Sequence, residues 1–282
     1  MKHDQRTVSL AYSTCPNDTF IFNAIYNRLI DLAGINFKIE LHDVEALNQN
    51  AAREVFEVSK LSFAAIAHLK GRYRMLRSGA ALGKGCGPLI VAKKGALSSG
   101  KLENETIAVP GLWTTACMLA SLYLKGRINP VPMRFDEIMP AVKAGKYACG
   151  VIIHEGRFTY QDYGLTSLVD LGQWWEDTTG LPIPLGVIGV KSGLPKELCL
   201  KTQNIIRQSV IYARRNPHDS YKYVRDHASE MAIDVIDRHI DLYVNDFTEE
   251  IGENGQHAIE KLFEKAASAG MIRQIPQPLF AT

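Results

Sequence analysis

Short apolar segments alternate with stretches of helical periodicity along the first half of this chain. Residues 7–12 and 35–41 have the composition and alternation of strands. Residues 19–29 and 43–56 carry apolar side chains at three- and four-residue spacing, which is typical of a helix packed on one face. A third short apolar segment follows at residues 58–61. Strands that alternate with helices in this way predict a mainly parallel sheet with helices on its faces.

A second series of the same kind begins after a segment rich in lysine, glycine and serine at residues 93–100. A strand is predicted at residues 106–109, a helix at 114–124 and a buried strand at 148–153. A further strand, at residues 187–190, follows a proline-rich segment. Two α/β series in one chain of 282 residues predict two lobes, since a domain averages roughly 150 residues.

The remaining elements are predicted from weaker patterns. Two shorter apolar segments, at residues 75–78 and 132–135, also predict strands. From residue 196 to the C-terminus the sequence is mostly helical, with breaks predicted at Asn216–Pro217 and around residues 252–255. This helical region must pack against one of the two lobes.

The order of these elements implies that the chain passes between the lobes twice, near residues 93 and 186. We therefore expect a larger lobe from residues 1–93 and 186–282, which includes the C-terminal helices, and a smaller lobe from residues 94–185. A cleft would lie between them. Ligands of open α/β sheets bind beyond the carboxyl ends of strands, near helix N-termini, so function is expected at the strand-to-helix turns that face this cleft.

Charge and cysteine content limit the classes of partner. Lys and Arg number 32 against 30 Asp and Glu, and a net charge of +2 is too small for a nucleic-acid or membrane-surface binder. A small-molecule ligand is therefore expected. The five cysteines are spread along the chain without a C-x-x-C pair, which disfavours a disulfide framework and a zinc ribbon.

The N-terminal region predicts a cytoplasmic protein. Its apolar run, residues 8–12, is shorter than the roughly 7 to 15 apolar residues of a secretory signal. No later stretch approaches the roughly 18 consecutive apolar residues of a membrane span. We expect a protein of a reducing compartment without a membrane anchor.

Polar side chains follow the first predicted strand and precede the helix after it. The turn runs from Ser13 to Thr19, and its backbone N–H groups could bind an anion. Capping of the helix by Asn17 or Asp18 explains the same residues equally well. Both interpretations remain open on sequence alone.

Two further turns carry hydroxyl or ammonium groups. Lys60 and Ser62 lie at the end of a short apolar segment, where a solvated surface lysine is the common alternative. Thr114 and Thr115 stand side by side at a helix start, and a threonine N-cap explains one of them but not both. These residues are candidates for ligand binding in the cleft.

His154 follows the apolar residues 150–153, which places its ring at the carboxyl end of a buried strand. A structural histidine is the usual alternative, but imidazole is the side chain best matched to proton transfer near neutral pH. His154-Glu155 would begin the zinc-binding sequence H-E-x-x-H, yet Phe158 stands where the second histidine is required. No metal site is predicted.

Several segments of the chain, taken in order, form a recognisable set. They are Ser13-Thr14-Cys15-Pro16-Asn17-Asp18-Thr19-Phe20, Ser59-Lys60-Leu61-Ser62, Arg77-Ser78-Gly79-Ala80-Ala81-Leu82-Gly83, Thr114-Thr115, Ile153-His154-Glu155-Gly156-Arg157-Phe158-Thr159-Tyr160 and Trp174-Trp175-Glu176. The set resembles the 1,4-dihydroxy-6-naphthoate synthase family of the futalosine route to menaquinone. The resemblance runs from about residue 8 to the C-terminus, with the segments in the family's order.

The resemblance implies a fold and an activity. The fold is like that of the type II periplasmic binding proteins, α/β with two lobes, two crossovers and a cleft between the lobes. The activity is that of a cytoplasmic carbon–carbon lyase, which converts cyclic de-hypoxanthine futalosine into 1,4-dihydroxy-6-naphthoate and dihydroxyacetone without metal or organic cofactor. The sequence leaves the oligomeric state open, with a homodimer as one alternative.

The resemblance also implies roles for single residues. His154 matches the family's proposed catalytic base. The matching substrate-binding residues are Lys60, Leu61, Ser62, Thr114 and Thr115. Secondary site candidates are Ser13, Asn17, Asn48 and Arg157. Leu112-Trp113 departs from the smaller or more polar residues of the family at these positions, which puts the shape of the pocket wall in question.

Two other functions fit the same fold. A solute-binding module of the periplasmic type needs no catalyst, but the predicted lack of a signal sequence counts against it. The sister family of the pathway, which dehydrates chorismate, shares the fold. The Ser-Thr-Cys-Pro-Asn-Asp and His-Glu segments favour the naphthoate synthase over the chorismate dehydratase.

Overall fold

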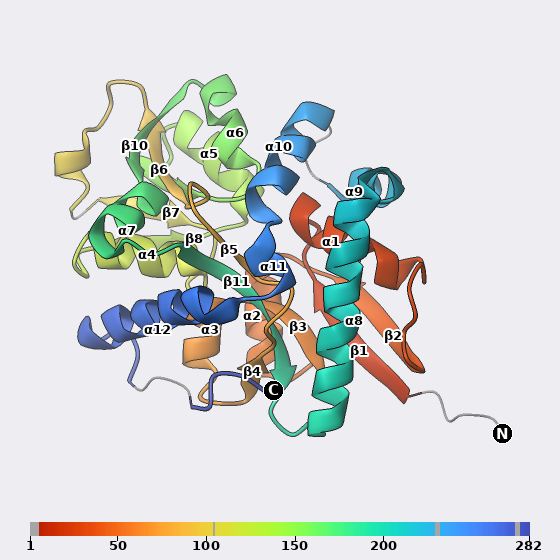
Figure 1. Cartoon of the computed structure of the whole chain (residues 1–282). Coiled ribbons are helices and arrows are strands. Elements are labelled where there is room, and N and C mark those ends of the chain that lie inside the picture. The colour runs from red at the N-terminus through yellow and green to blue at the C-terminus, as the bar shows by residue number, and fades with distance from the viewer. Residues whose placement is uncertain (1–5, 104, 229–231, 274–276) are drawn as a thin grey trace.

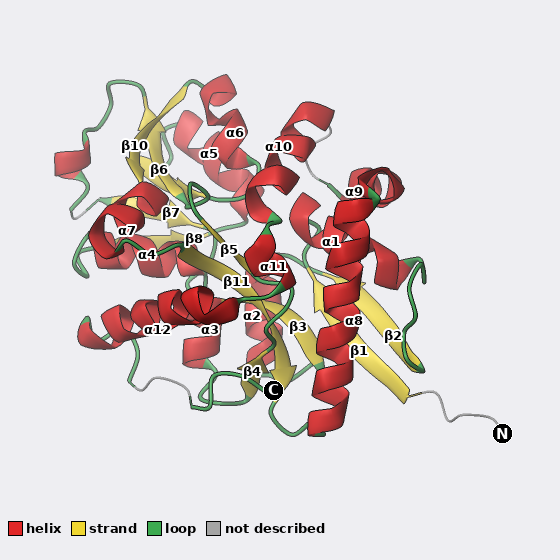
Figure 2. Cartoon of the chain, in the orientation of Figure 1, coloured by secondary structure: helices red, strands yellow, loops and turns green. Residues whose placement is uncertain are grey.

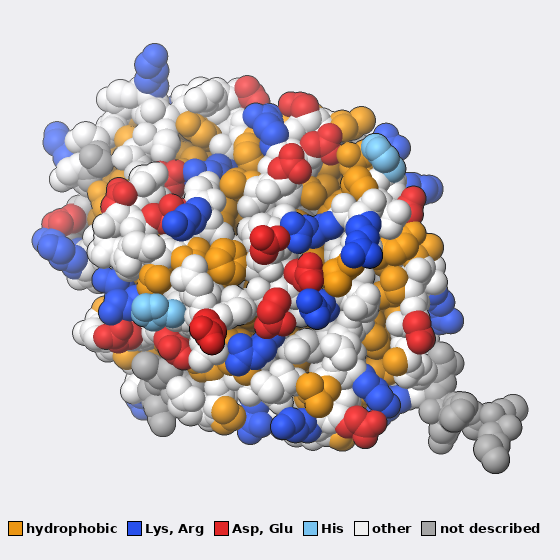
Figure 3. All heavy atoms as spheres, viewed as in Figure 1, with side chains coloured by type: hydrophobic (Ala, Val, Ile, Leu, Met, Phe, Trp, Pro, Cys, Tyr) orange, Lys and Arg blue, Asp and Glu red, His pale blue; other side chains and the backbone are white. Residues whose placement is uncertain are grey.

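The computed structural model describes residues 6–103, 105–228, 232–273 and 277–282. The strands form two sheets, each covered by helices, in the two-lobed α/β arrangement expected from the sequence (Figure 1, Figure 2). Acidic and basic side chains are interspersed on the face shown in Figure 3. No helix within the described ranges has both the length and the apolar character needed to cross a membrane.

The first sheet contains the strands of the larger lobe: β1 (Arg6–Tyr12), β2 (Ile35–Leu41), β3 (Val58–Ser62), β4 (Tyr73–Met75), β5 (Ala81–Gly83) and β11 (Ile183–Lys191). Their order is β2-β1-β3-β11-β4, and β5 also pairs with β11. β1 runs parallel to β2 and β3, whereas β11 runs antiparallel to its neighbours β3, β4 and β5. One strand, β11, is therefore reversed in an otherwise parallel sheet.

The second sheet repeats this plan with β6 (Leu89–Lys93), β7 (Thr106–Val109), β8 (Asn129–Pro132), β9 (Cys149–Ile152) and β10 (Leu165–Asp170). Their order is β10-β6-β9-β7-β8. β7 is parallel to β8 and β9, and β6 is antiparallel to β9 and β10. The predicted parallel character is confirmed, and the reversed strand in each sheet is the one with which the chain enters from the other lobe.

The chain passes between the two sheets twice. It leaves the first sheet after β5 and joins the second at β6, so the first passage lies at residues 84–88. It returns between β10 and β11, over residues 171–182. β6, which ends at Lys93, pairs with β9 and β10 of the second sheet. The division into lobes at residues 93 and 186 stays a prediction.

Helices pack on both sheets and fill the C-terminal third of the chain (Figure 2). They are α1 (Pro16–Tyr26), α2 (Val44–Ala52), α3 (Phe63–His68), α4 (Thr115–Tyr123), α5 (Phe135–Lys143), α6 (Gly156–Thr159), α7 (Leu171–Thr179), α8 (Lys196–Arg215), α9 (Tyr221–His227), α10 (Ile233–Tyr243), α11 (Asp246–Glu249) and α12 (Gly252–Ser268). Short 3-10 helices cover Ser99–Lys101, Tyr160–Tyr163 and Pro217–Ser220. One apolar core joins residues of both sheets with residues of α12.

Two predicted strands are shifted along the sequence. The strand expected at residues 75–78 lies earlier, because β4 ends at Met75. The strand expected at residues 132–135 also lies earlier, because β8 ends at Pro132 and α5 begins at Phe135. Asp136 and Glu137 lie in the first turn of α5, where acidic side chains stabilise a helix.

The helix break predicted around residues 252–255 lies slightly earlier, at residues 250–251 between α11 and α12, and α12 begins at Gly252. The chain also turns at Asn245, whose side chain accepts a hydrogen bond from Phe247 N and whose backbone N donates one to Thr248 Oγ1. This capping box starts α11 and ends the preceding helix. The break predicted at Asn216–Pro217 is confirmed, because α8 ends at Arg215.

Gly87 and Gly172 bring the first passage and α7 into backbone contact, and this contact generates a stability prediction. A Cβ on Gly87 would lie 2.2 Å from Gly172 Cα, so Gly87→Ala must displace backbone. We expect a loss of about 1–3 kcal/mol in the free energy of unfolding, measured by urea denaturation. Gly193→Ala is the control, because nothing lies within 4 Å of its added Cβ. Equal stability of the two variants would contradict the close packing.

Candidate active site

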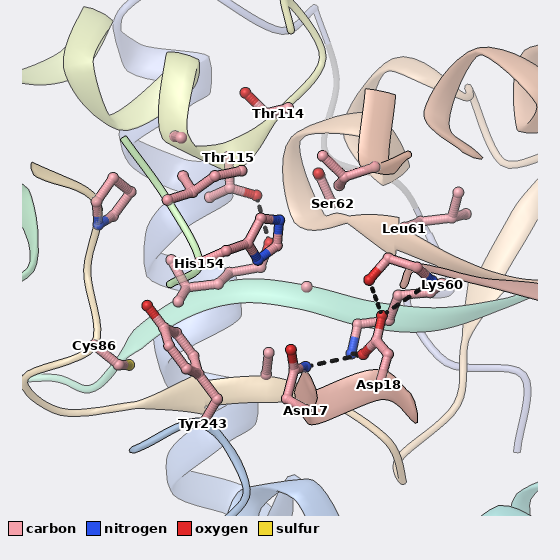
Figure 4. Close-up of a pocket in the computed structure, with 18 residues that line it drawn as sticks. Asn17, Asp18, Lys60, Leu61, Ser62, Cys86, Thr114, Thr115, His154 and Tyr243 are labelled. Carbon is pink, nitrogen blue, oxygen red and sulfur yellow. Dashed lines mark hydrogen bonds and ion pairs between the residues drawn. The ribbon is translucent and has the colours of Figure 1, made fainter. Parts of the chain in front are cut away.

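A cavity lies between the lobes, where strand ends of both sheets meet (Figure 4). It is lined by the turns after β1, β7 and β9, by residues of β3 and β11, by the first passage between the sheets and by the end of α10. Eight of the predicted site residues line it: Ser13, Asn17, Lys60, Leu61, Ser62, Thr114, Thr115 and His154. The parallel strands explain this convergence, because their carboxyl ends reach the same edge of each sheet.

An ion pair lies in the wall of the cavity. Lys60 Nζ is 2.8 Å from Asp18 Oδ1, and the two side chains are 8% and 2% exposed. Lys60 Nζ also donates to Gly79 O at 3.0 Å. Ser13 Oγ donates to the second Asp18 oxygen at 2.7 Å. A buried ammonium is stable only with such partners, so the solvated-lysine alternative is wrong for Lys60.

Asp18 and Asn17 are not the caps of α1 that one interpretation expected. The N-cap position is Cys15, whose side chain makes no capping hydrogen bond. Asn17 Nδ2 donates instead to Asp18 Oδ1 at 2.9 Å, and both residues line the cavity. Asn17 and Asp18 thus line the cavity and do not cap the helix. The sequence alone does not identify Asp18 as a site residue.

Ser62 is oriented by Asn48 from α2. Asn48 Nδ2 donates to Ser62 Oγ at 3.1 Å, and Ser62 N donates to Asn48 Oδ1 at 3.0 Å. Asn48 is buried and is not among the residues that line the cavity. This secondary candidate therefore contacts a lining residue, Ser62, without lining the cavity itself.

The two threonines at the start of α4 have different partners. Thr114 is the N-cap, since its Oγ1 accepts from Cys117 N and donates to Gly111 O. Thr115 Oγ1 donates to Leu185 O at 2.7 Å and accepts from Ala64 N at 3.3 Å. The capping interpretation is thus confirmed for Thr114, while Thr115 ties the smaller lobe to the larger one.

His154 occupies a constrained position just beyond β9. Its φ of 55° lies in the left-handed region, which is uncommon for residues other than glycine. Its Nδ1 is 3.2 Å from Cys15 Sγ, and its ring packs edge-on against Phe135. Among the described residues, no hydrogen-bond partner reaches the buried Nε2 atom. An imidazole nitrogen without a protein partner at a cavity wall can accept a proton from a bound molecule.

The surroundings keep both members of the Cys15–His154 contact neutral. Burial lowers the pKa of His154 to about 4, with Asp18 opposing this shift and Lys60 adding to it. Burial raises the pKa of the Cys15 thiol well above its ordinary value, and the Glu155 and Asp18 carboxylates add to the shift. Cys15 is thus a neutral thiol beside a neutral imidazole, and not an activated nucleophile.

Cys15, His154 and Glu155 are also the one described group whose ligand atoms lie within 4.8 Å of one another. Sulfur, nitrogen and carboxylate oxygen are ligands that zinc accepts. A metal at this point would have to displace a proton from a thiol of raised pKa. The absence of a metal site stays a prediction.

Arg157 does not line the cavity. Its guanidinium pairs with Asp170 at 2.5 Å and donates to Gly87 O at 2.7 Å. Asp170 is the N-cap of α7, so Arg157 fastens α7 to the first passage between the lobes. Arg157 therefore stabilises the packing of α7 and does not contact the cavity.

A second contact between the lobes joins α2 to the turn before α4. Trp113 N donates to the Glu45 carboxylate, with distances of 3.4 and 3.3 Å to its two oxygens. Asn48 Nδ2 donates to Trp113 O at 3.4 Å. Leu112 is exposed, and neither it nor Trp113 lines the cavity. The departure from the family at Leu112-Trp113 therefore lies in the contact between lobes and not in the pocket wall.

Tyr243 and His239 come from α10, far along the sequence from the other site residues. Tyr243 lines the cavity, and burial raises the pKa of its hydroxyl. His239 is fully buried, with its Nε2 3.0 Å from Asn17 Oδ1. The sequence pattern of α10 is that of an ordinary amphipathic helix, which gives no signal that two of its residues reach a site formed by strand ends.

Comparison with known proteins assigns this chain to a family. The sequence profile of a menaquinone biosynthesis family matches residues 8–268. This chain belongs to that family. A relative from Thermus thermophilus, named 1,4-dihydroxy-6-naphthoate synthase, is 45% identical over 96% of the chain and 98% of its own length. A relative of the same name from Streptomyces coelicolor is 41% identical over 94% of the chain and 95% of its own length.

Solved structures confirm the two-lobed fold of this chain. A protein from Archaeoglobus fulgidus is 34% identical, with a TM-score of 0.90 over 96% of this chain and all of that one. The alkanesulfonate-binding protein of Xanthomonas axonopodis has a TM-score of 0.72 over 95% of this chain and 94% of its own, at 13% identity. At this identity the second likeness concerns the fold alone. The family match favours a biosynthetic enzyme over a solute-binding module.

The buried ion pair generates a prediction for this family member. Asp18→Asn keeps the shape of the side chain but leaves the Lys60 ammonium without a counter-charge. We expect a loss of about 3–5 kcal/mol in the free energy of unfolding, measured by urea denaturation. Asp226→Asn removes the acid of an exposed pair with Lys222 and should leave the unfolding midpoint in place. If the two variants are equally stable, the ion pair contributes nothing to the fold.

Proposed function

We propose that this chain is a 1,4-dihydroxy-6-naphthoate synthase, a carbon–carbon lyase that converts cyclic de-hypoxanthine futalosine into 1,4-dihydroxy-6-naphthoate and dihydroxyacetone. Two relatives of that name, at 45% and 41% identity over nearly full length, support the assignment. The observation that carries the chemistry is a neutral imidazole, His154, on the wall of a cavity between lobes. We further propose that the enzyme is cytoplasmic and works without a cofactor.

His154 is the general base of the proposed reaction. The product is an aromatic diol, so loss of one carbon-bound proton can start a cleavage that expels the three-carbon fragment, with aromatisation as a driving force. The proton passes to Nε2 of His154, which has no partner among the described residues. A neutral histidine is already in the form that accepts a proton.

The other lining residues would bind and orient the substrate. Ser62 and Thr115 are each held by protein hydrogen bonds and keep lone pairs or a hydroxyl hydrogen for a ligand. Lys60 supplies positive charge that is fixed by Asp18. Because both lobes contribute, closure around the substrate would exclude water from a reactive intermediate.

The decisive experiment incubates the purified protein with cyclic de-hypoxanthine futalosine and detects the naphthoate by mass spectrometry. We expect turnover by the wild-type protein. We expect His154→Asn to lower kcat by about 10² to 10⁴-fold, the usual contribution of a positioned base, with little change in substrate affinity. A folded His154→Asn variant with near-wild-type kcat would place the base elsewhere. No turnover, with tight reversible binding of another solute, would favour the solute-binding module.

The low pKa of His154 predicts the pH dependence of the reaction. Its base form is present above a pKa of about 4 and is lost as the pH falls through that value. We therefore expect kcat/KM to stay level from neutral pH downward and to decline only near pH 4. A catalytic histidine with the ordinary pKa of 6.5 would instead cause the decline near pH 6.5. Circular dichroism at each pH controls for unfolding. An acid limb centred at 6.5 or above would contradict the buried environment assigned to this ring.

A further inference from the structure

A chain of buried hydrogen bonds leads from α10 to the ammonium group in the cavity wall. His239 Nε2 is 3.0 Å from Asn17 Oδ1, and Asn17 Nδ2 donates to Asp18 Oδ1 at 2.9 Å. Lys60 Nζ lies 2.8 Å from the same Asp18 oxygen (Figure 4). Each of the four side chains is buried. Elements far apart in the sequence, α10, α1 and β3, thus meet in one polar network.

The donors and acceptors of this network have one consistent direction. The Asp18 carboxylate, paired with an ammonium, accepts hydrogen bonds, so the Asn17 amide must turn its NH₂ group toward it. The Asn17 carbonyl oxygen then faces His239, which must donate from Nε2. This assignment fixes the His239 tautomer and leaves its Nδ1 unprotonated. Among the described residues, that Nδ1 atom has no partner.

His239 can hold Asn17 without adding charge to the site. Burial lowers the pKa of His239 well below its ordinary value, and the nearby His154 lowers it further. The two rings are 6.3 Å apart between centroids. A neutral donor at this place orients the amide while the Asp18–Lys60 pair remains a balanced pair of one negative and one positive group.

Lys60 has one N–H bond left for a ligand. An ammonium has three, and the described residues take two, those to Asp18 Oδ1 and Gly79 O. Lys60 lines the same cavity as His154. When His154 takes a carbon-bound proton, the electron pair stays on the substrate, and a fixed ammonium beside it would stabilise the negative charge.

We propose that His239 is a positioning residue of this active site, which acts through Asn17 and Asp18 to aim the Lys60 ammonium at the negative charge formed on the substrate. Lys60 is then a catalytic residue in addition to a binding one. The proposal rests on the proposed function for the reaction, but the hydrogen-bond chain itself can be tested without it. A misaimed ammonium should slow the chemical step more than it weakens binding.

The kinetic test compares two substitutions of His239. His239→Leu removes the donor, and we expect kcat to fall by about 10- to 100-fold, the cost of a displacement near 1 Å, with little change in KM. His239→Gln keeps an N–H donor and should restore most of kcat. His257→Leu, on the exposed face of α12, is the matched control and should behave as wild type. Wild-type kcat in His239→Leu, or a change confined to KM, would overturn the proposal.

A variant cycle covers the case in which His239→Leu folds poorly. Asn17→Ala breaks the same hydrogen-bond network one step nearer to Asp18, so it should lower kcat, and adding His239→Leu should lower kcat little further. If the fold-changes in kcat of the two single substitutions multiply in the double variant, His239 does not act through Asn17. Absence of turnover by the wild-type protein would count against the proposed function. It would not count against the hydrogen-bond network from His239 to Lys60.

Nuclear magnetic resonance tests the hydrogen-bond network from His239 to Lys60 without any substrate. With histidine labelled by nitrogen-15, we expect His239 in the neutral Nε2–H form at neutral pH. Asn17→Ala should change the His239 signals and leave those of His257 in place. A charged His239, or one protonated at Nδ1, would overturn the assigned direction of the hydrogen bonds from His239 to Lys60.

Discussion

The buried contact between Lys60 and Asp18 is the interaction on which the arrangement of the site depends. Two charges with side chains 8% and 2% exposed are stable only if each keeps several partners, and those partners are distributed over β3, α1, Ser13 and Gly79. The pair therefore fixes the first turn of the chain against the third strand. The same two charges act in opposite directions on the pKa of His154. The pair thus contributes both to the shape of the cavity wall and to the electrostatics at His154.

The sequence predicts those parts of the site that local pattern controls. Ser62, Thr114 and His154 follow apolar segments at the ends of parallel strands, and strand ends of one sheet converge whatever the rest of the chain does. His239 and Tyr243 could not be found in this way, because their place depends on how a C-terminal helix packs across the cleft. The Cys15–His154 contact, likewise, joins residues 139 positions apart.

The fold was predictable to a similar degree and for similar reasons. Parallel strands between helices have a clear period, whereas the reversed strands β6 and β11 depend on pairing with distant segments. β10 escaped prediction because Leu165–Asp170 mixes polar and apolar residues without strict alternation.

The Trp113–Glu45 contact also has an energetic consequence. It joins the backbone before α4 in one lobe to a carboxylate of α2 in the other, and burial raises the pKa of Glu45. These hydrogen bonds must break if the lobes move apart at this point. Breaking them exposes one backbone N–H and one carboxylate to water, which can form hydrogen bonds with both groups, so the net free energy lost with the contact is much smaller than the strength of the hydrogen bonds themselves.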